Sequence, residues 1–221
     1  MGMGVDTRNQ MAKRAAEEIK NGMVVNLGIG IPSLVPNHLA NEIQVMFHAE
    51  NGITGMGPSP VKGKEDENLC NAGGFPVTLT KGGSYCDSAI AFGMIRSGRV
   101  DITILGSLQV NQFGDLANWI VPGKKVPGMG GAMELAQKAK KVIVVMNHCD
   151  KNGHPKIVNT CSLPLTSARC VDLIITELAV FKVTGGGLVL TELFPPYNLE
   201  DVIGKTGCTF QICDSIRQIP Y

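Results

Sequence analysis

The residues Val142-Ile143-Val144-Val145-Met146 decide the fold class, because they form an unbroken apolar run in which four of the five are β-branched. A run this short and this β-branched predicts a strand that is buried on both faces of a sheet. Similar runs stand upstream at residues 101–105 and 23–27, and downstream at residues 171–176. The chain therefore contains several strands of the kind that helices cover from both sides.

Helical patterns alternate with these strands. A first helix is expected to begin at Asp6 or Thr7 and to end at Gly22, and others are expected near residues 33–39, from Asp87 through Ile95, and at residues 132–140. Alternation of this kind predicts a three-layer α/β/α open sheet with mostly parallel strands. The C-terminal part differs, since residues 179–183 and 188–193 predict a hairpin, followed by a last helix near residue 199.

Composition places limits on domain organisation and partners. The chain has 221 residues with no internal repeat or linker, so residues 1–221 are expected to form a single domain. A net charge of +1 predicts no general attraction to nucleic acid or anionic membranes. The sequence has no apolar run of the roughly 18 residues that a membrane-spanning helix needs.

Cysteine and histidine usage indicates a reducing compartment and no metal centre. Seven cysteines occur without a CxxC pair or a signal peptide, which predicts a cytoplasmic protein without a disulfide framework. The four histidines show no spacing typical of metal ligands, so no metal is expected.

The candidate site lies at one edge of the predicted sheet. Ligands of open α/β sheets bind at the carboxyl ends of strands, and the loops after residues 27, 49 and 105 occupy such positions. This geometry makes candidates of Asn26, Glu50, Asn51 and Gln109.

Residues 50–57 are the strongest of these candidates, with the sequence ENGITGMG. They combine a carboxylate, an amide and three glycines in what is expected to be one tight loop. Glu50 in such a loop could attack an acyl group as a nucleophile, with Asn51 orienting it and glycine amides stabilising negative charge. The alternative is that Glu50 ends a strand at the surface and pairs with a lysine.

Gly28 and Gly30 follow a predicted strand and resemble half of a dinucleotide-binding fingerprint. Ser33 stands where the third glycine would be, so the signal for NAD is weak. We expect instead that Gly28 allows a close backbone approach to some ligand.

Other features keep two interpretations each. Lys124 and Lys125 could contact phosphate groups or form a solvated turn. Trp119 could pack on an adenine ring, or fill a core or interface. Cys149, beside His148, could be a thiol nucleophile or a buried structural cysteine, which is the more common case.

Eight motifs in order give the chain a resemblance to the β subunit of family I CoA-transferases. This group includes the 3-oxoacid, acetate/acetoacetate and butyrate–acetoacetate CoA-transferases. The motifs are NLGIGIP at 26–32, ENGITGMG at 50–57, NAG at 71–73, LGSLQV at 105–110, LANW at 116–119, PGK at 122–124, GMGGAM at 128–133 and CSLPLT at 161–166. The resemblance covers nearly the whole chain. It implies the open sheet of these enzymes, a fold shared with sugar-phosphate isomerases.

The resemblance also implies a reaction and a set of site residues. The glutamate of the family's Glu-Asn-Gly motif is the nucleophile, which corresponds to Glu50. The reaction would be a ping-pong exchange through a glutamyl-CoA thioester, with coenzyme A as a substrate and no permanently bound cofactor. Matching positions that line the site are Asn26, Asn118, Gly130 and Gly131, and Asn51 follows by adjacency.

The resemblance implies a partner as well. In this family the β subunit works with an α subunit of similar fold, as an αβ dimer or an α2β2 tetramer, so the isolated chain is expected to be inactive. Gly74 replaces a lysine that is frequent in succinyl-CoA-dependent members, which favours short monocarboxylic or 3-oxo acids as substrates. Two alternatives stay open, an acyl-CoA hydrolase and a non-catalytic ligand-binding module of the same fold.

Overall fold

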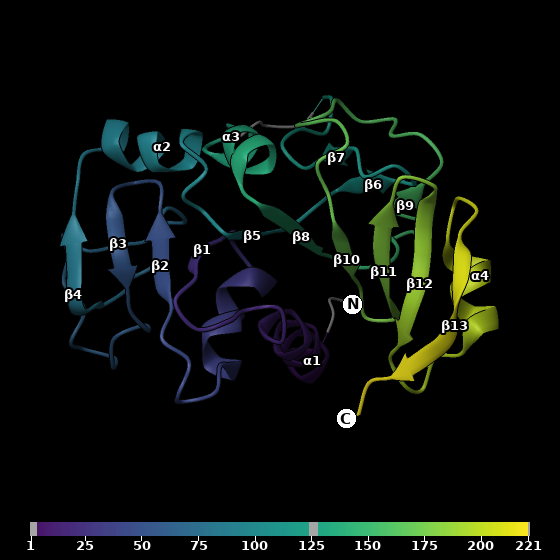
Figure 1. Cartoon of the computed structure of the whole chain (residues 1–221), viewed down its shortest axis with the longest axis horizontal. Coiled ribbons are helices and arrows are strands. Elements are labelled where there is room, and N and C mark those ends of the chain that lie inside the picture. The colour runs from purple at the N-terminus through teal and green to yellow at the C-terminus, as the bar shows by residue number, and fades with distance from the viewer. Residues whose placement is uncertain (1–3, 124–127, 221) are drawn as a thin grey trace.

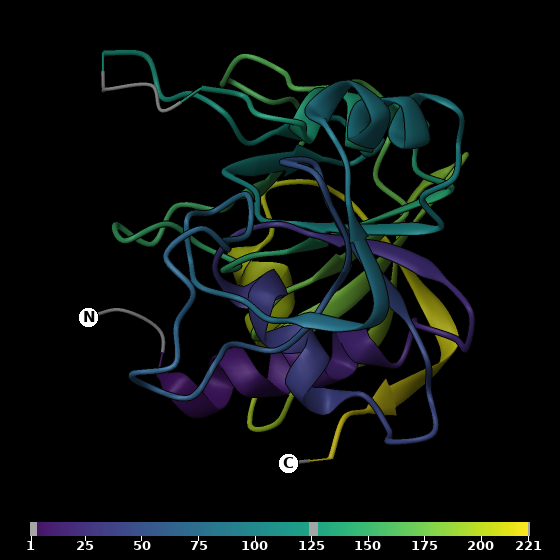
Figure 2. The same cartoon turned by 90° about the vertical axis from the view of Figure 1, so that its left-hand side faces the viewer.

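The computed structural model describes residues 4–123 and 128–220 and shows a ten-stranded mixed sheet between two layers of helices (Figure 1). The strand order is β13-β12-β11-β10-β8-β5-β1-β2-β3-β4. Figure 2 shows α1 below the sheet and α2 above it. The predicted α/β fold with a mostly parallel open sheet is confirmed. The central parallel strands are β1 (Val24–Leu27), β2 (Met46–Ala49), β5 (Ile102–Leu105), β8 (Lys141–Val145) and β10 (Leu173–Ile175).

Two central strands expected to be buried on both faces form as predicted. All four residues of β5 are buried, and so are the last four of β8. A strand covered on both faces has no polar side to expose, which explains why these segments lack alternation.

One expected loop is a strand instead. Only residues 50–52 turn, and residues 53–56 form β3 (Ile53–Met56), antiparallel to β2 and to β4 (Leu79–Tyr85). The register of β3 and β4 shifts between Thr54 and Met56, at Gly55. Gly55 has a φ of +79°, and a Cβ there would lie 2.7 Å from the Cα of Gly83. Glycine at this position therefore makes a β-bulge rather than a ligand loop.

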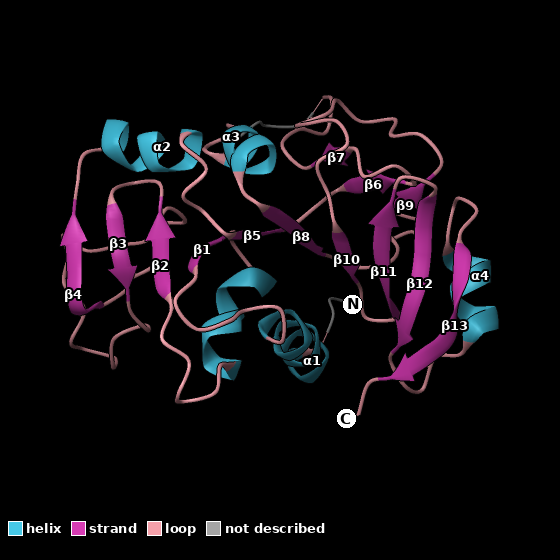
Figure 3. Ribbon diagram, in the orientation of Figure 1, coloured by secondary structure: helices cyan, strands magenta, loops and turns pink. Residues whose placement is uncertain are grey.

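The C-terminal hairpin is confirmed as β11 (Ala179–Thr184) and β12 (Gly187–Leu193). The edge strand β13 (Gln211–Gln218) pairs in parallel with β12 and was not expected from the sequence. A second sheet was not expected either, and it lies among loops in Figure 3. Its strands, in spatial order, are β7 (Leu116–Ala117), β6 (Gln109–Asn111) and β9 (Ile157–Val158).

The helices begin largely where predicted, and their ends differ more. Asp87 caps α2 (Ser88–Arg96) by accepting a hydrogen bond from the backbone of Ile90 at 2.8 Å. The first helix, α1 (Val5–Ala16), ends well before Gly22. Prolines at the start and in the interior of the next segment leave a 3₁₀ helix, η1 (Ile31–His38). The remaining helices are α3 (Ala132–Lys138) and α4 (Leu199–Lys205).

In the described residues, no helix has the length and apolar character needed to cross a bilayer.

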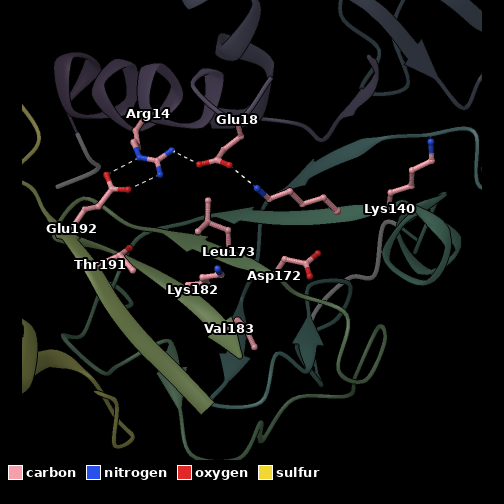
Figure 4. Close-up of a pocket in the computed structure, with 10 residues that line it drawn as sticks. Arg14, Glu18, Lys140, Asp172, Leu173, Lys182, Val183, Thr191 and Glu192 are labelled. Carbon is pink, nitrogen blue, oxygen red and sulfur yellow. Dashed lines mark hydrogen bonds and ion pairs between the residues drawn. The ribbon is translucent and has the colours of Figure 1, made fainter. Parts of the chain in front are cut away.

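A buried ionic cluster fixes α1 to the sheet. Arg14 donates from Nε to Glu192 at 2.7 Å and from Nη1 to Glu18 at 2.7 Å, and Lys141 donates to the other oxygen of Glu18 (Figure 4). Burial opposes the charge of Arg14, but the hydrogen bonds to Glu192 and Glu18 outweigh it and raise the pKa of Arg14. The cluster lines a groove of about 510 Å³ at the amino ends of β8 and β10, the sheet edge opposite to Glu50.

Candidate active site

A row of polar residues crosses the sheet below the proposed nucleophile. Thr103 of β5 pairs in register with Asn26 of β1, Asn26 with His48 of β2, and His48 with Thr54 of β3. Thr54 in turn pairs with Ser84 of β4. Directly paired residues project to the same face of a sheet, so these five side chains form one line across five strands. We call this line the polar row.

The three residues of the polar row that lie on β5, β1 and β2 are almost fully enclosed. Asn26 and His48 are each 1% exposed, and Thr103 is 0% exposed. Polar groups buried to this extent destabilise a fold unless they are hydrogen-bonded. Their bonds therefore show what the row supports.

Asn26 carries the contact to Glu50. Its Nδ2 donates to Glu50 Oε2 at 3.0 Å and to the main-chain oxygen of His48 at 3.1 Å, which uses both hydrogens of the amide. Glu50 follows β2 directly and is half-buried. The amide thus holds one carboxylate oxygen in place and leaves Oε1 free of this contact.

Gly131 forms the other side of the site. It stands at the amino end of α3, and a Cβ built on it would lie 3.1 Å from Cγ and 3.4 Å from Oε1 of Glu50. Its backbone, with φ −80° and ψ 0°, is one that any residue can adopt. A side chain here would therefore be limited by the close approach of Glu50, which would have to shift by a few tenths of an ångström, and not by backbone conformation.

His48 faces α2 from the polar row. Its Nε2 lies 3.2 Å from the carbonyl oxygen of Ala91, which can only accept, so Nε2 carries the proton. Burial lowers the pKa of His48, so the ring is neutral near pH 7. Within the described residues, Nδ1 has no hydrogen-bond partner.

Three of the predicted site residues serve other contacts. Asn51 donates to the carbonyl of Cys70 at 2.8 Å, so its amide is directed to the next loop and not to Glu50. The N–H of Gly28 donates to Ile104 at 2.8 Å, and a Cβ on Gly28 would lie 3.1 Å from the same oxygen. Gly28 therefore permits close packing of the strand ends of β1 and β5. Gln109 of β6 accepts from the backbone of Ser162 at 2.9 Å and so contacts the 161–166 segment.

Asn118 and Gly130 shape the neighbouring loops. Asn118 donates to Gly106 at 3.1 Å and accepts from Thr166 at 2.6 Å, which ties the loop after β5 to the 161–166 segment. Gly130 has a φ of +55°, and a Cβ there would meet no atom within 4 Å. No contact of either residue with Glu50 is seen in the described residues. Their predicted roles toward a ligand stay predictions.

The other candidates are resolved in part. Lys124 and Lys125 lie outside the described residues. Trp119 donates from Nε1 to Leu165 at 3.3 Å. Burial raises the pKa of the Cys149 thiol, and burial lowers the pKa of His148 to about 4. A protonated thiol beside a neutral histidine favours the structural interpretation of this pair. No group of three or more potential metal-ligating side chains is found in residues 4–123 and 128–220.

Two residues of the site were missed from the sequence, His48 and Thr103. Each is polar within an otherwise apolar run, 46–49 and 102–105. That interruption is the signal that could have identified them, because a buried strand retains a polar residue only where it finds a partner.

Alanine in place of Gly131 is expected to lower the turnover number by about 10- to 100-fold, since the added methyl group displaces Glu50 by a few tenths of an ångström or more. The measurement is the steady-state turnover number of the variant and of the wild type. Gly93→Ala is the matched control, because a Cβ on Gly93 meets nothing within 4 Å. Wild-type turnover by Gly131→Ala would show that this approach is not part of the site.

Comparison with known proteins shows the family to which the chain belongs. The family described as Coenzyme A transferase matches residues 8–205, and the chain belongs to this family. It is 62% identical over 212 residues to a probable coenzyme A transferase subunit beta of Bacillus subtilis, with 96% of this chain and 98% of that protein covered.

A longer relative and a solved structure add to this. The chain is 50% identical over 212 residues to a mitochondrial succinyl-CoA:3-ketoacid coenzyme A transferase 2A of Rattus norvegicus, covering 95% of this chain and 41% of that protein. The apoenzyme structure of an acyl-CoA transferase from Escherichia coli O157:H7 superposes with a TM-score of 0.77 at 22% identity. It covers 100% of this chain and 44% of that one, and this likeness shows the fold.

Proposed function

We propose that this chain is the β subunit of a CoA-transferase that moves CoA between an acyl-CoA and a free short-chain carboxylic or 3-oxo acid. The observation that carries the proposal is the Asn26–Glu50 contact at 3.0 Å, with Gly131 packed against the opposite side of the carboxylate. One oxygen is held by a buried amide, and the other lies 3.4 Å from the position that a Cβ on Gly131 would take. This is an arrangement suited to a carboxylate nucleophile.

The proposed reaction needs no proton transfer to Glu50. Oε1 attacks the thioester carbonyl carbon, the C–S bond breaks, and CoA leaves as a thiolate, giving an acyl-glutamyl anhydride. The thiolate then attacks Cδ of Glu50, the bond between Cδ and the bridging oxygen breaks, and the first acid leaves as a carboxylate that carries this oxygen. The resulting glutamyl-CoA thioester reacts with the acceptor acid through the same steps in reverse.

Asn26 supports these steps from a fixed position. Its N–H binds the carboxylate oxygen in the resting state and would bind the negative charge that develops on the same oxygen when Cδ is attacked. Gly130 and Gly131 are proposed to present their N–H groups on the other side. Exclusion of water preserves the thioester energy, because hydrolysis of the anhydride competes with transfer.

The partial exposure of Glu50 to water supports the need for a partner subunit. Glu50 is half-buried in the isolated chain, and an α subunit in an αβ or α2β2 assembly would cover it. Two findings support this. A relative 62% identical is named as a subunit beta, and the chain accounts for 41% of a longer relative, which leaves room there for a second half.

The backbone conformation of Gly74 bears on the choice of substrates. Gly74 has a φ of +76°, a conformation in which the lysine that is frequent in succinyl-CoA-dependent members would be strained. This favours short monocarboxylic or 3-oxo acids. The relative with 50% identity is named for succinyl-CoA and 3-ketoacids, so succinate is included among the acids to be tested.

The test is chemical trapping of the intermediate. The chain is co-expressed with its α partner, incubated with acetoacetyl-CoA or succinyl-CoA, treated with borohydride and mapped by peptide mass spectrometry. Reduction of Glu50 to the alcohol is expected with the correct donor, while the exposed Glu42 serves as the internal control. Transfer of CoA with Glu50 unmodified would place the nucleophile elsewhere. Rapid loss of acyl-CoA without an acceptor acid would favour the hydrolase.

A further inference from the structure

Thr103 is a buried hydroxyl in the middle of an apolar strand. It is 0% exposed, and its neighbours along β5 are Ile102 and Ile104, both buried. A hydroxyl enclosed in this way destabilises the fold unless it finds a hydrogen-bond partner. Valine has nearly the same shape and would satisfy packing alone, so the hydroxyl needs an explanation.

The strand register shows which partner is available. On one side Thr103 pairs with Val142 of β8, which is apolar, and on the other it pairs with Asn26 of β1. Thr103 Oγ1 donates to Asn26 Oδ1 at 3.4 Å, and this is the one hydrogen bond of its side chain found in the described residues.

The Thr103 hydroxyl contacts the carbonyl oxygen of the Asn26 amide, whereas Glu50 contacts its nitrogen. Nδ2 faces two acceptors, Glu50 Oε2 and the carbonyl of His48, whereas Oδ1 faces the hydroxyl of Thr103. Turning the amide over would set Oδ1 against two oxygen atoms. The orientation seen therefore gives every polar atom of this amide a partner of the right kind.

We propose that Thr103 is a positioning residue for the transfer reaction, acting on Glu50 through Asn26. The inference rests on the proposed function of Glu50. Donation from the Thr103 hydroxyl to Oδ1 of Asn26 keeps the Asn26 amide in the orientation that binds Oε2 of Glu50 and leaves Oε1 of Glu50 free to attack. The same donation polarises the amide, so that its N–H is a better donor. At 3.4 Å the bond is long for a hydroxyl, so its main effect is on direction and not on strength.

The test compares Thr103→Val with Thr103→Ser in the assembled enzyme. Val keeps the shape and removes the donor, and the expected result is a turnover number roughly tenfold lower with little change in KM, the size expected for one lost hydrogen bond. Thr103→Ser keeps the donor and is expected to restore most of the lost turnover.

Thr191→Val is the matched control. It removes a hydroxyl that donates to Val180 in β11, away from Glu50, so it is expected to leave the turnover number and KM unchanged. A Thr103→Val enzyme with a lower melting temperature but a wild-type turnover number would overturn the inference. Absence of transfer by the wild type would instead overturn the proposed function, on which this inference depends.

Discussion

Replacing Glu50 with Gln is expected to lower the rate of CoA transfer by more than about 1,000-fold, because an amide cannot attack a thioester as a carboxylate does. Glutamine has almost the same volume, so the space against Gly131 and the fold are kept. The measurement is exchange of CoA between labelled acid and acyl-CoA by the assembled enzyme. Borohydride reduction of the variant is expected to leave residue 50 unmodified.

Two further variants test whether the loss of activity is due to the carboxylate at residue 50. Glu50→Asp retains a carboxylate but withdraws it by one methylene group from Asn26, which now holds it at 3.0 Å, so activity between that of the wild type and that of the Gln variant is expected. Glu42→Gln removes an exposed carboxylate before β2 and is expected to have wild-type activity. Substantial transfer by Glu50→Gln would mean that another group is the nucleophile.

The second large effect is on stability. Arg14→Met is expected to lower the free energy of unfolding by about 3–5 kcal/mol, because it leaves the carboxylate of Glu192 buried without its main partner. Glu192 is 7% exposed, and Arg14 contacts both of its oxygens. Chemical denaturation of the two proteins measures the difference.

The double variant Arg14→Met/Glu192→Met separates loss of the pair from loss of one partner. It is expected to be more stable than Arg14→Met alone, since no uncompensated charge stays buried. Arg96→Met is the matched control, because it removes an exposed ion pair with Glu134 and is expected to leave the denaturation midpoint nearly unchanged. Equal effects of Arg14→Met and Arg96→Met would contradict this account of the cluster.

The sequence predicts those parts of the fold that depend on local pattern. Three elements have their signal within a few residues and form as expected. They are the apolar strand that ends near Met146, the helix cap at Asp87 and the hairpin that turns before Gly187. The bulge at Gly55 was misread as a loop, because its cause is the approach of Gly83 from another strand. Short strands such as β7 and β9 also depend on partners distant in sequence.

The same limit applies to the site. The sequence predicts Asn26, Glu50 and Gly131 as site residues, and the structure places them together. The polar interruption of the apolar run marks Thr103 as a residue that needs a partner, but only the register with β1 shows that this partner is Asn26. Asn51 was favoured for its position next to Glu50, but adjacent residues at a turn need not point in the same direction.

The packing of α2 bears on motion at the site. In the described residues, Ile95 of α2 belongs to a cluster of only three buried apolar residues, with Val100 and Leu135. The cluster that includes α1 has 21 such residues, and α3 also contributes Ala136 to a cluster of 17. Local opening is easiest where few apolar contacts hold an element, so we expect α2 to fluctuate more than α1. Because His48 of the polar row contacts Ala91 of α2, ordering this helix when an acyl group binds would lose entropy and reduce the observed affinity.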